Sequence, residues 1–268
     1  MQNFILILKY ILIGIVQGLT EIFPLSSSGH LAVLYKLLNI NNENQLGITI
    51  YLHFASSLSL LMFFKRDVIN IAKGGMKYIF KKDKNYIKEF KTIIYLIIAS
   101  IPAAIVGFFL DDYIEETFNN IYLVAFSFII TAIILFIHNN ISIKNQVDYN
   151  FKNTLTTGIF QAFAIMPGIS RSGMTLFGSK ITRLKDDLAK KFSFYLLIVV
   201  SFGSSFLSLI KTKITFDETT ILYFISMLFA FVFTYLSLKV FFNYKLKKSK
   251  YFFAIYLLVV SFLIFLLF

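Results

Sequence analysis

The sequence contains no cysteine, and acidic residues are scarce: Asp and Glu number 14 against 26 Lys and Arg, giving a formal net charge of +12. Without cysteine the protein can form no disulfide, perform no thiol chemistry and hold no cysteine-ligated zinc. Apolar residues are in excess, at 57% of the chain with a mean hydropathy of +0.75. This composition is far from that of soluble domains and predicts a protein of the lipid bilayer.

Long apolar runs recur along the chain, and a helix needs roughly 20 such residues to cross about 30 Å of hydrocarbon. Six runs approach or reach that length: Ile48–Phe64, Thr92–Leu110, Ile121–Ile137, Phe192–Ile210, Ile221–Val240 and Tyr251–Phe268. We therefore predict an all-α polytopic membrane protein with six spans, forming a single integral domain over residues 1–268. The longest polar stretch, Lys65–Lys91, is expected to be a loop too short to bury a second core. The apolar start, Phe4–Val16, lacks a basic leader and a small-residue cleavage site, so we expect it to remain in the mature protein.

The basic residues gather in particular loops. Lys65–Lys91 carries nine Lys and Arg, and Lys180–Lys191 and Asn243–Lys250 are also basic, whereas Asp111–Thr117 is purely acidic. Basic loops of a membrane protein lie on the cytoplasmic side. We expect these loops inside, 111–120 and both termini outside, bilayer lipids as neighbours, and no nucleic acid partner.

Two regions interrupted by Gly, Pro and Ser resemble each other. Residues 17–29 read QGLTEIFPLSSSG and residues 161–173 read QAFAIMPGISRSG, with the Gln and the Ser-x-Ser-Gly 144 residues apart. Three spans follow each copy, and an odd number forces the second copy to enter the membrane upside down. We predict an inverted-topology repeat, with repeat 1 at about 1–140 and repeat 2 at about 153–268. Each half is a re-entrant helix hairpin plus three transmembrane helices.

The two breaks carry groups suited to an anion. Pro24 and Pro167 each stop a half-helix, and the Ser-rich turn that follows can begin another with free N–H groups. Glu21 and Arg171 are lone charges in apolar stretches, where a charge costs roughly 2.5–3.5 kcal/mol, so we expect each to pair or bind something. The guanidinium of Arg171 suits a phosphate. The two breaks also supply short hydroxyl donors, namely Ser26, Ser27, Ser28, Ser170, Ser172 and Thr175.

Groups that could act on a bound phosphate adjoin the first break. Gln17 and Glu21 share one helix face, and His30 lies three residues after Ser27. A hydroxyl or imidazole near a carboxylate is sufficient for nucleophilic attack and proton transfer, and a carboxylate can equally hold a divalent metal. His53, within a span, is expected to be a packing residue rather than a site partner. A transporter or flippase stays an alternative, because inverted repeats with broken helices are also typical of carriers.

The segments QGLTEIFPLSSSGH and PGISRSGMT are similar to the two signature segments of the bacterial undecaprenyl-diphosphate phosphatases of the bacitracin-resistance type, and the resemblance covers essentially the whole chain. It implies an integral membrane enzyme that hydrolyses undecaprenyl diphosphate to the monophosphate and phosphate, recycling the lipid carrier for cell-wall synthesis. It also implies a long-chain prenyl diphosphate substrate and an active site open to the outer face of the inner (plasma) membrane. A homodimer is left open.

The resemblance further implies particular residues. By matching position these are Gln17 and Glu21 at the Glu/Gln-x-x-x-Glu pair, Ser26, Ser27 and His30 in the catalytic turn, and Ser170, Arg171 and Thr175 in the second segment. Mg²⁺ or Ca²⁺ is the implied cofactor, with Glu21 as its ligand. Two positions depart from the pattern, because Gln17 stands where Glu is common and Ser28 where Thr is common. We expect Ser27 to attack with His30 shuttling the proton, or His30 itself to be the nucleophile.

Overall fold

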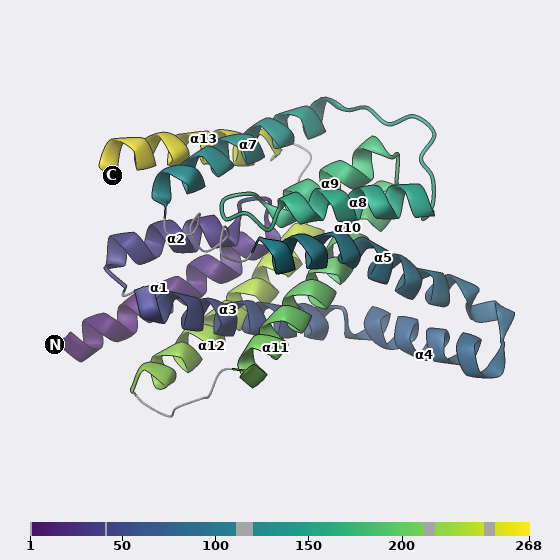
Figure 1. The fold of residues 1–268 in the computed structure, drawn as a ribbon, viewed down its shortest axis with the longest axis horizontal. Coiled ribbons are helices and arrows are strands. Elements are labelled where there is room, and N and C mark those ends of the chain that lie inside the picture. The colour runs from purple at the N-terminus through teal and green to yellow at the C-terminus, as the bar shows by residue number, and fades with distance from the viewer. Residues whose placement is uncertain (1, 41, 111–119, 212–217, 244–249) are drawn as a thin grey trace.

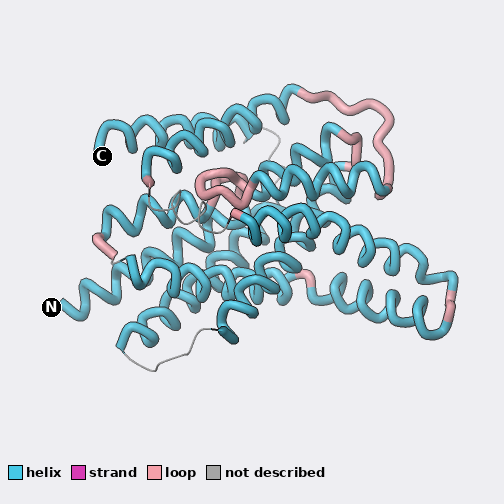
Figure 2. The backbone as a smooth tube through the Cα atoms, viewed as in Figure 1, coloured by secondary structure: helices cyan, strands magenta, loops and turns pink. Residues whose placement is uncertain are grey.

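The computed structural model describes residues 2–40, 42–110, 120–211, 218–243 and 250–268. Over these ranges the chain is helical apart from its connecting turns, and extended pairing is limited to an isolated bridge between Val147 and Leu184 (Figures 1 and 2). The all-α prediction is therefore confirmed.

The helices fall into two sets along the chain. The first contains α1 (Gln2–Ile22), α2 (Ser27–Leu38), α3 (Asn42–Phe63), α4 (Lys65–Lys81), the short 3₁₀ turn η1 (Lys84–Tyr86), α5 (Ile87–Phe109) and α7 (Ile121–Asn140). The second contains α8 (Phe151–Phe163), α9 (Arg171–Ile181), α10 (Asp186–Leu197), the π-helical η2 (Ile198–Phe202), α11 (Gly203–Lys211), α12 (Glu218–Asn243) and α13 (Lys250–Leu267).

Among the described residues, five stretches are long and apolar enough to cross a membrane: Phe4–Ile22, Lys84–Phe109, Ile121–Asn140, Asp186–Phe206 and Thr220–Asn243. Gly47–Phe63 joins them if it is counted with α4, from which it is bent by 78°, while Tyr251–Leu267 is a shorter apolar helix. The protein is thus a multi-pass membrane protein with five to six candidate spans.

The expectation of a loop over Lys65–Lys91 is wrong, because most of it forms α4, η1 and the start of α5. Gly74 and Gly75 are buried in α4, and a Cβ at either would meet a side chain of α5. Tyr78 stacks on Phe90 with ring centroids 4.6 Å apart. The abundant lysines suggested a loop, but they occupy the exposed side of a helix whose other side packs on α5. The predicted outer segment Asp111–Thr117 lies outside the described residues, as does most of Asn243–Lys250.

The first helix of each broken pair packs against a helix of the other half. α1 lies along α12, and α8 lies along α5. The close approach depends on glycine: a Cβ at Gly14 would lie 2.3 Å from the Ser226 carbonyl oxygen, and one at Gly158 would lie 2.5 Å from that of Ala99. α1 and α8 run in opposite directions, and α7 packs against α13 (Figure 1).

The two predicted breaks exist, and they meet beside the middle of α7. The Thr131 hydroxyl donates to the Gly168 carbonyl at 3.0 Å and accepts from the Ser170 amide at 3.1 Å. The Ser172 hydroxyl donates to the Phe23 carbonyl at 3.3 Å, which joins one turn to the other. Since α7 is long enough to cross the bilayer, both turns lie well inside the membrane-spanning body.

Candidate active site

Glu21 stands one residue before the end of α1 and is only 8% exposed. Its Oε2 accepts hydrogen bonds from Gln17 Nε2 at 3.1 Å and from the Ser27 hydroxyl. The second contact crosses the break, since Ser27 is the first residue of α2. The turn therefore aims an alcohol at a buried carboxylate, which is the arrangement needed for a base to activate a nucleophile.

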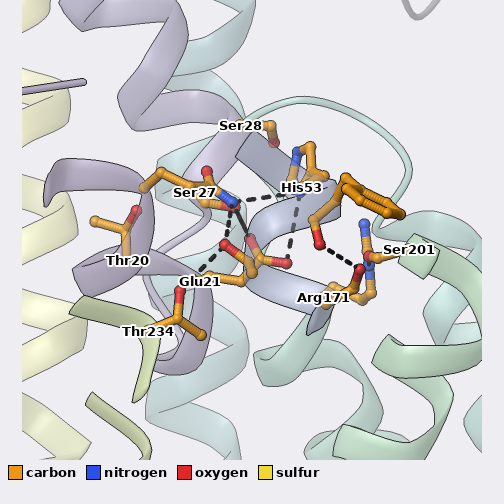
Figure 3. Close-up of polar contacts among 12 residues, drawn as sticks. Thr20, Glu21, Ser27, Ser28, His53, Arg171, Ser201 and Thr234 are labelled. Carbon is orange, nitrogen blue, oxygen red and sulfur yellow. Dashed lines mark hydrogen bonds and ion pairs between the residues drawn. The ribbon is translucent and has the colours of Figure 1, made fainter. Parts of the chain in front are cut away.

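His53 on α3 belongs to the same cluster (Figure 3). Its Nδ1 lies 3.6 Å from Glu21 Oε1 and 3.4 Å from Gln17 Nε2. Gln17 Nε2 also donates to the Ser56 hydroxyl at 3.3 Å, and Ser56 in turn accepts from Thr234 of α12 at 3.1 Å. His53 is therefore a site neighbour, although its place in an apolar span favoured a packing role.

The turn after α1 is held in an unusual backbone conformation. Ser26 has φ +64°, in the left-handed region that non-glycine residues seldom adopt. Its hydroxyl accepts from the Gly29 amide at 3.4 Å, which caps α2, and lies 3.4 Å from the Ser28 hydroxyl. The remaining free N–H groups at this helix start favour an anion near Ser27.

The structure pairs His30 with groups other than Glu21 and Ser27. His30 Nδ1 lies 2.8 Å from the Ser26 carbonyl, and Nε2 lies 3.0 Å from the hydroxyl of Tyr256 on α13. The imidazole stacks on Tyr256 at a centroid distance of 5.6 Å and adjoins Phe128 at 5.0 Å. Both ring nitrogens are thus engaged elsewhere, which does not suit the proton-shuttle or nucleophile role expected from the sequence.

Arg171 opposes this cluster from the second half of the chain. It is the first residue of α9, and its Nη1 donates to the hydroxyl of Ser201 in η2. Figure 3 shows Arg171 and Ser201 on the side of Glu21 that also carries His53. Within the described ranges no carboxylate lies within 4.0 Å of Arg171. The guanidinium therefore keeps donors for a ligand.

The remaining predicted binding residues hold the second turn in place. The Ser170 hydroxyl caps α9 by accepting from the Gly173 amide at 3.2 Å and lies 3.3 Å from the Ser172 hydroxyl. Thr175 bonds its own helix at the Arg171 carbonyl, 3.0 Å away, and the Ser193 hydroxyl at 2.5 Å. Ser170 and Thr175 are fully buried, so these contacts fix where Arg171 points.

Four further neighbours could not be identified from the sequence: Ser56, Ser201, Thr234 and Tyr256. Each is a hydroxyl-bearing residue of an apolar span, where such residues more often serve close packing. In the structure, the π-helical turn that contains Ser201 marks it, because such turns are frequent at functional sites. That turn has no signature in the sequence.

Oxygen atoms of the site suit a hard divalent cation. Gln17 Oε1 is buried and has no hydrogen-bond partner, and it belongs to the residue that bonds Glu21. In the described part of the chain no group of three or more His, Cys, Asp and Glu could enclose a metal. One carboxylate with an amide oxygen fits Mg²⁺, which keeps several waters and binds substrate phosphates.

Comparison with known proteins identifies the family of the chain. The family described as bacitracin resistance protein BacA matches residues 10–263. Undecaprenyl-diphosphatase 2 of Bacillus thuringiensis (strain Al Hakam) is 37% identical over 264 residues, which are 97% of each chain. Undecaprenyl-diphosphatase of Oceanobacillus iheyensis is 35% identical over 98% of this chain and 97% of its own, and that of Methanococcus maripaludis (strain C6) is 37% identical over 91% and 95%. The chain belongs to the bacitracin resistance protein family.

Proposed function

We propose that this protein is an integral membrane phosphatase that hydrolyses undecaprenyl diphosphate to undecaprenyl phosphate and inorganic phosphate. The observation that carries the proposal is the Ser27 hydroxyl bonded to the buried Glu21 carboxylate, with the Arg171 guanidinium opposite. The relatives named undecaprenyl-diphosphatase support the same reaction. A carrier would need the cation but not an activated alcohol, so the site favours hydrolysis over transport.

The diphosphate is bound by donors from both turns. Arg171 binds the terminal phosphate with the guanidinium donors that Ser201 leaves free. The starts of α2 and α9 add backbone N–H groups and the positive ends of two helix dipoles. Because these donors are already oriented by the Ser26 and Ser170 caps, they can stabilise charge in the transition state without reorganising.

Covalent chemistry then proceeds in two steps. Ser27 Oγ attacks the terminal phosphorus, its proton passes to Glu21 Oε2, and the bond from that phosphorus to the bridging oxygen breaks, releasing the lipid monophosphate. The departing monophosphate takes that proton from Glu21, which returns Glu21 to its carboxylate form. A water molecule next attacks the phosphoserine, giving one proton to Glu21. The Ser27–phosphorus bond breaks, and Ser27 regains its proton from Glu21 as inorganic phosphate leaves. Glu21 is the base in both steps because it is the carboxylate in contact with Ser27.

A divalent cation fits beside Glu21 Oε1 and the unpartnered Gln17 Oε1. When bound, such an ion neutralises phosphate charge during transfer. Gln17 supplies no charge of its own here, so Glu21 is the one anionic ligand that the cluster offers.

The membrane arrangement belongs to the same proposal. We place α1–α2 as a hairpin entering from the outer face and α8–α9 as its inverted counterpart entering from the cytoplasm of the inner membrane. The opposed directions of α1 and α8, and their matching glycine contacts with α12 and α5, support this assignment. Basic Lys65–Lys91 then lies inside, as charge placement requires, and the Glu21 site opens to the outer face.

The test is phosphate release by purified protein given a long-chain prenyl diphosphate with Mg²⁺. Ser27→Ala, Glu21→Gln and Arg171→Ala should each lower kcat by about 10²–10⁴-fold, as expected for loss of a nucleophile, a base or a charged phosphate ligand. Tyr251→Phe, on the distant end of α13, is the matched control and should leave turnover unchanged. Undiminished turnover in the Ser27 and Glu21 variants would refute the site, and substrate movement without phosphate release would favour a carrier.

A further inference from the structure

We propose that Tyr256 is a positioning residue, which holds His30 in one tautomer so that His30 secures the Ser26 turn and thereby aims Ser27. This inference rests on the proposed function only in its last step, the role of Ser27. It assigns His30 a contact with the backbone instead of a share in proton transfer, and it brings the last span of the chain into the site.

The two partners of His30 determine where its proton lies. The Ser26 carbonyl can only accept a hydrogen bond, so Nδ1, at 2.8 Å, must carry the proton. In a neutral imidazole Nε2 is then unprotonated and must accept. The Tyr256 hydroxyl, 3.0 Å away, is the donor that satisfies it. The partner on Nε2 thus fixes the tautomer that Nδ1 presents to Ser26.

Aromatic contacts hold the imidazole ring of His30 in place. Tyr256 stacks on the imidazole with an interplanar angle of 6°, and the fully buried Phe128 of α7 adjoins it at 5.0 Å. Tyr256 lies 226 residues from His30 in sequence, so the contact joins α2 to α13. A ring packed against two other rings and bonded at both nitrogens is poorly suited to move toward Ser27.

The imidazole bonds the carbonyl of Ser26, the residue of the turn whose backbone is strained. Ser26, at φ +64°, is in a conformation that costs on the order of 1–3 kcal/mol and persists only where its surroundings enforce it. Its carbonyl accepts from His30 twice, from Nδ1 and from the backbone amide at 3.2 Å. Because Ser27 follows directly, relaxation at Ser26 would rotate the Ser27 hydroxyl away from Glu21.

The first experiment reads the tautomer in the resting protein, without any substrate. The chain has three histidines, so ¹⁵N-histidine labelling gives a small set of imidazole signals, and His30→Asn identifies those of His30. The wild type should show a protonated Nδ1 and a bare Nε2. Tyr256→Phe, which keeps the ring but removes the hydroxyl, should shift His30 toward the other tautomer. Tyr251 is on the same helix as Tyr256, but its hydroxyl is bonded to Asn140 of α7, so Tyr251→Phe should leave the His30 signals unchanged. A protonated Nε2 in the wild type, or identical signals in Tyr256→Phe, would overturn the proposal.

The second experiment separates positioning from proton transfer. The Asn amide nitrogen in His30→Asn can still donate to the Ser26 carbonyl but cannot carry a proton between groups. We therefore expect His30→Asn to stay within about tenfold of wild-type kcat while His30→Ala falls about 100-fold, and Tyr256→Phe to lose about tenfold in kcat with KM little changed. Equal loss in His30→Asn and His30→Ala, in folded protein, would show that the imidazole itself is required and would refute positioning. A Ser27→Ala enzyme with full turnover would instead refute the proposed function, whatever the tautomer proves to be.

Discussion

The turn after α1 and the turn after α8 share one capping pattern but carry different functional groups. Ser26 and Ser170 cap the helices that follow, and both accept from a glycine amide. The first residue of each following helix is Ser27 in one copy and Arg171 in the other, positions that differ by 171 − 27 = 144, the offset of the repeat. The shared capping pattern brings the starts of α2 and α9 close together. The first residue of α2, Ser27, supplies an alcohol, and the first residue of α9, Arg171, supplies a cation.

The paired glutamines give the sharpest way to test this contrast. Gln17 bonds Glu21 and Ser56, whereas Gln161, at the equivalent position, is 1% exposed and has no hydrogen-bond partner at either side-chain atom in the described structure. Gln17→Leu should lower kcat by about 10–100-fold, because Glu21 loses the donor that orients it. Gln161→Leu should keep turnover and raise the free energy of unfolding by about 1–3 kcal/mol, because two unsatisfied buried groups are removed.

Phosphate release and thermal unfolding in detergent would measure both. Loss of activity in Gln161→Leu equal to that in Gln17→Leu would mean that the second copy also contributes a polar site, and the contrast between the two turns would fail.

The two helix breaks and their caps were predictable from the sequence because they depend on residues close together in the chain. Proline and the Ser-x-Ser-Gly pattern mark where one helix stops and the next is capped, and those breaks were placed correctly. The cluster of Gln17, Glu21 and Ser27 also follows from short-range spacing. Contacts between distant elements did not follow, because an isolated His53 or Tyr256 in an apolar helix has no pattern that reveals which groups pack against it.

The α4 helix was missed for a related reason. Its lysines dominate the composition of Lys65–Lys91, and its stability comes from burial of Gly74 and Gly75 against α5, which composition does not reveal. Tertiary packing, not local propensity, decides such segments.

Each turn contains one residue with a positive φ, a serine in the first turn and a glycine in the second. A second pair of substitutions tests this difference. Gly168 has φ +92°, and a Cβ there would lie 2.5 Å from the Ser127 Cβ. Gly168→Ala should therefore lose about 2–4 kcal/mol of stability, from backbone strain together with overpacking. Ser26→Gly relieves strain but removes a cap, so its stability should change by only a few tenths of a kcal/mol. Midpoints of thermal unfolding compare the two, and a tolerated Gly168→Ala would mean that the second turn can adopt another conformation.

The matching helix crossings predict a smaller and symmetric effect. Gly14→Ala and Gly158→Ala should each cost about 1–3 kcal/mol, since either methyl would press on a backbone carbonyl of the opposing helix. Gly107→Ala is the control: its Cβ would lie 3.8 Å from Ile165 Cδ1, and alanine favours a helix over glycine. Unfolding in detergent should leave Gly107→Ala unchanged or slightly stabilised. A large cost at only one of the two crossings would weigh against equivalent packing of α1 and α8.

Different polar contacts join the segments at the open end of each hairpin, away from its turn, and substitutions there should have the smallest effects. Lys9 Nζ donates to the Leu38 carbonyl at 2.6 Å, at the end of α2, while Lys185 Nζ lies 2.8 Å from an Asp148 carboxylate that is 74% exposed. Lys185→Met should change stability by at most about 1 kcal/mol, and less at high salt, because exposed ion pairs are screened. Lys9→Met should cost about 0.5–1.5 kcal/mol with little salt dependence, because the lost bond is part-buried and serves the free carbonyls of a helix end. Unfolding midpoints at low and high salt measure both, and a salt-sensitive loss in Lys9→Met would show that its charge acts through solvent instead of through the Leu38 carbonyl.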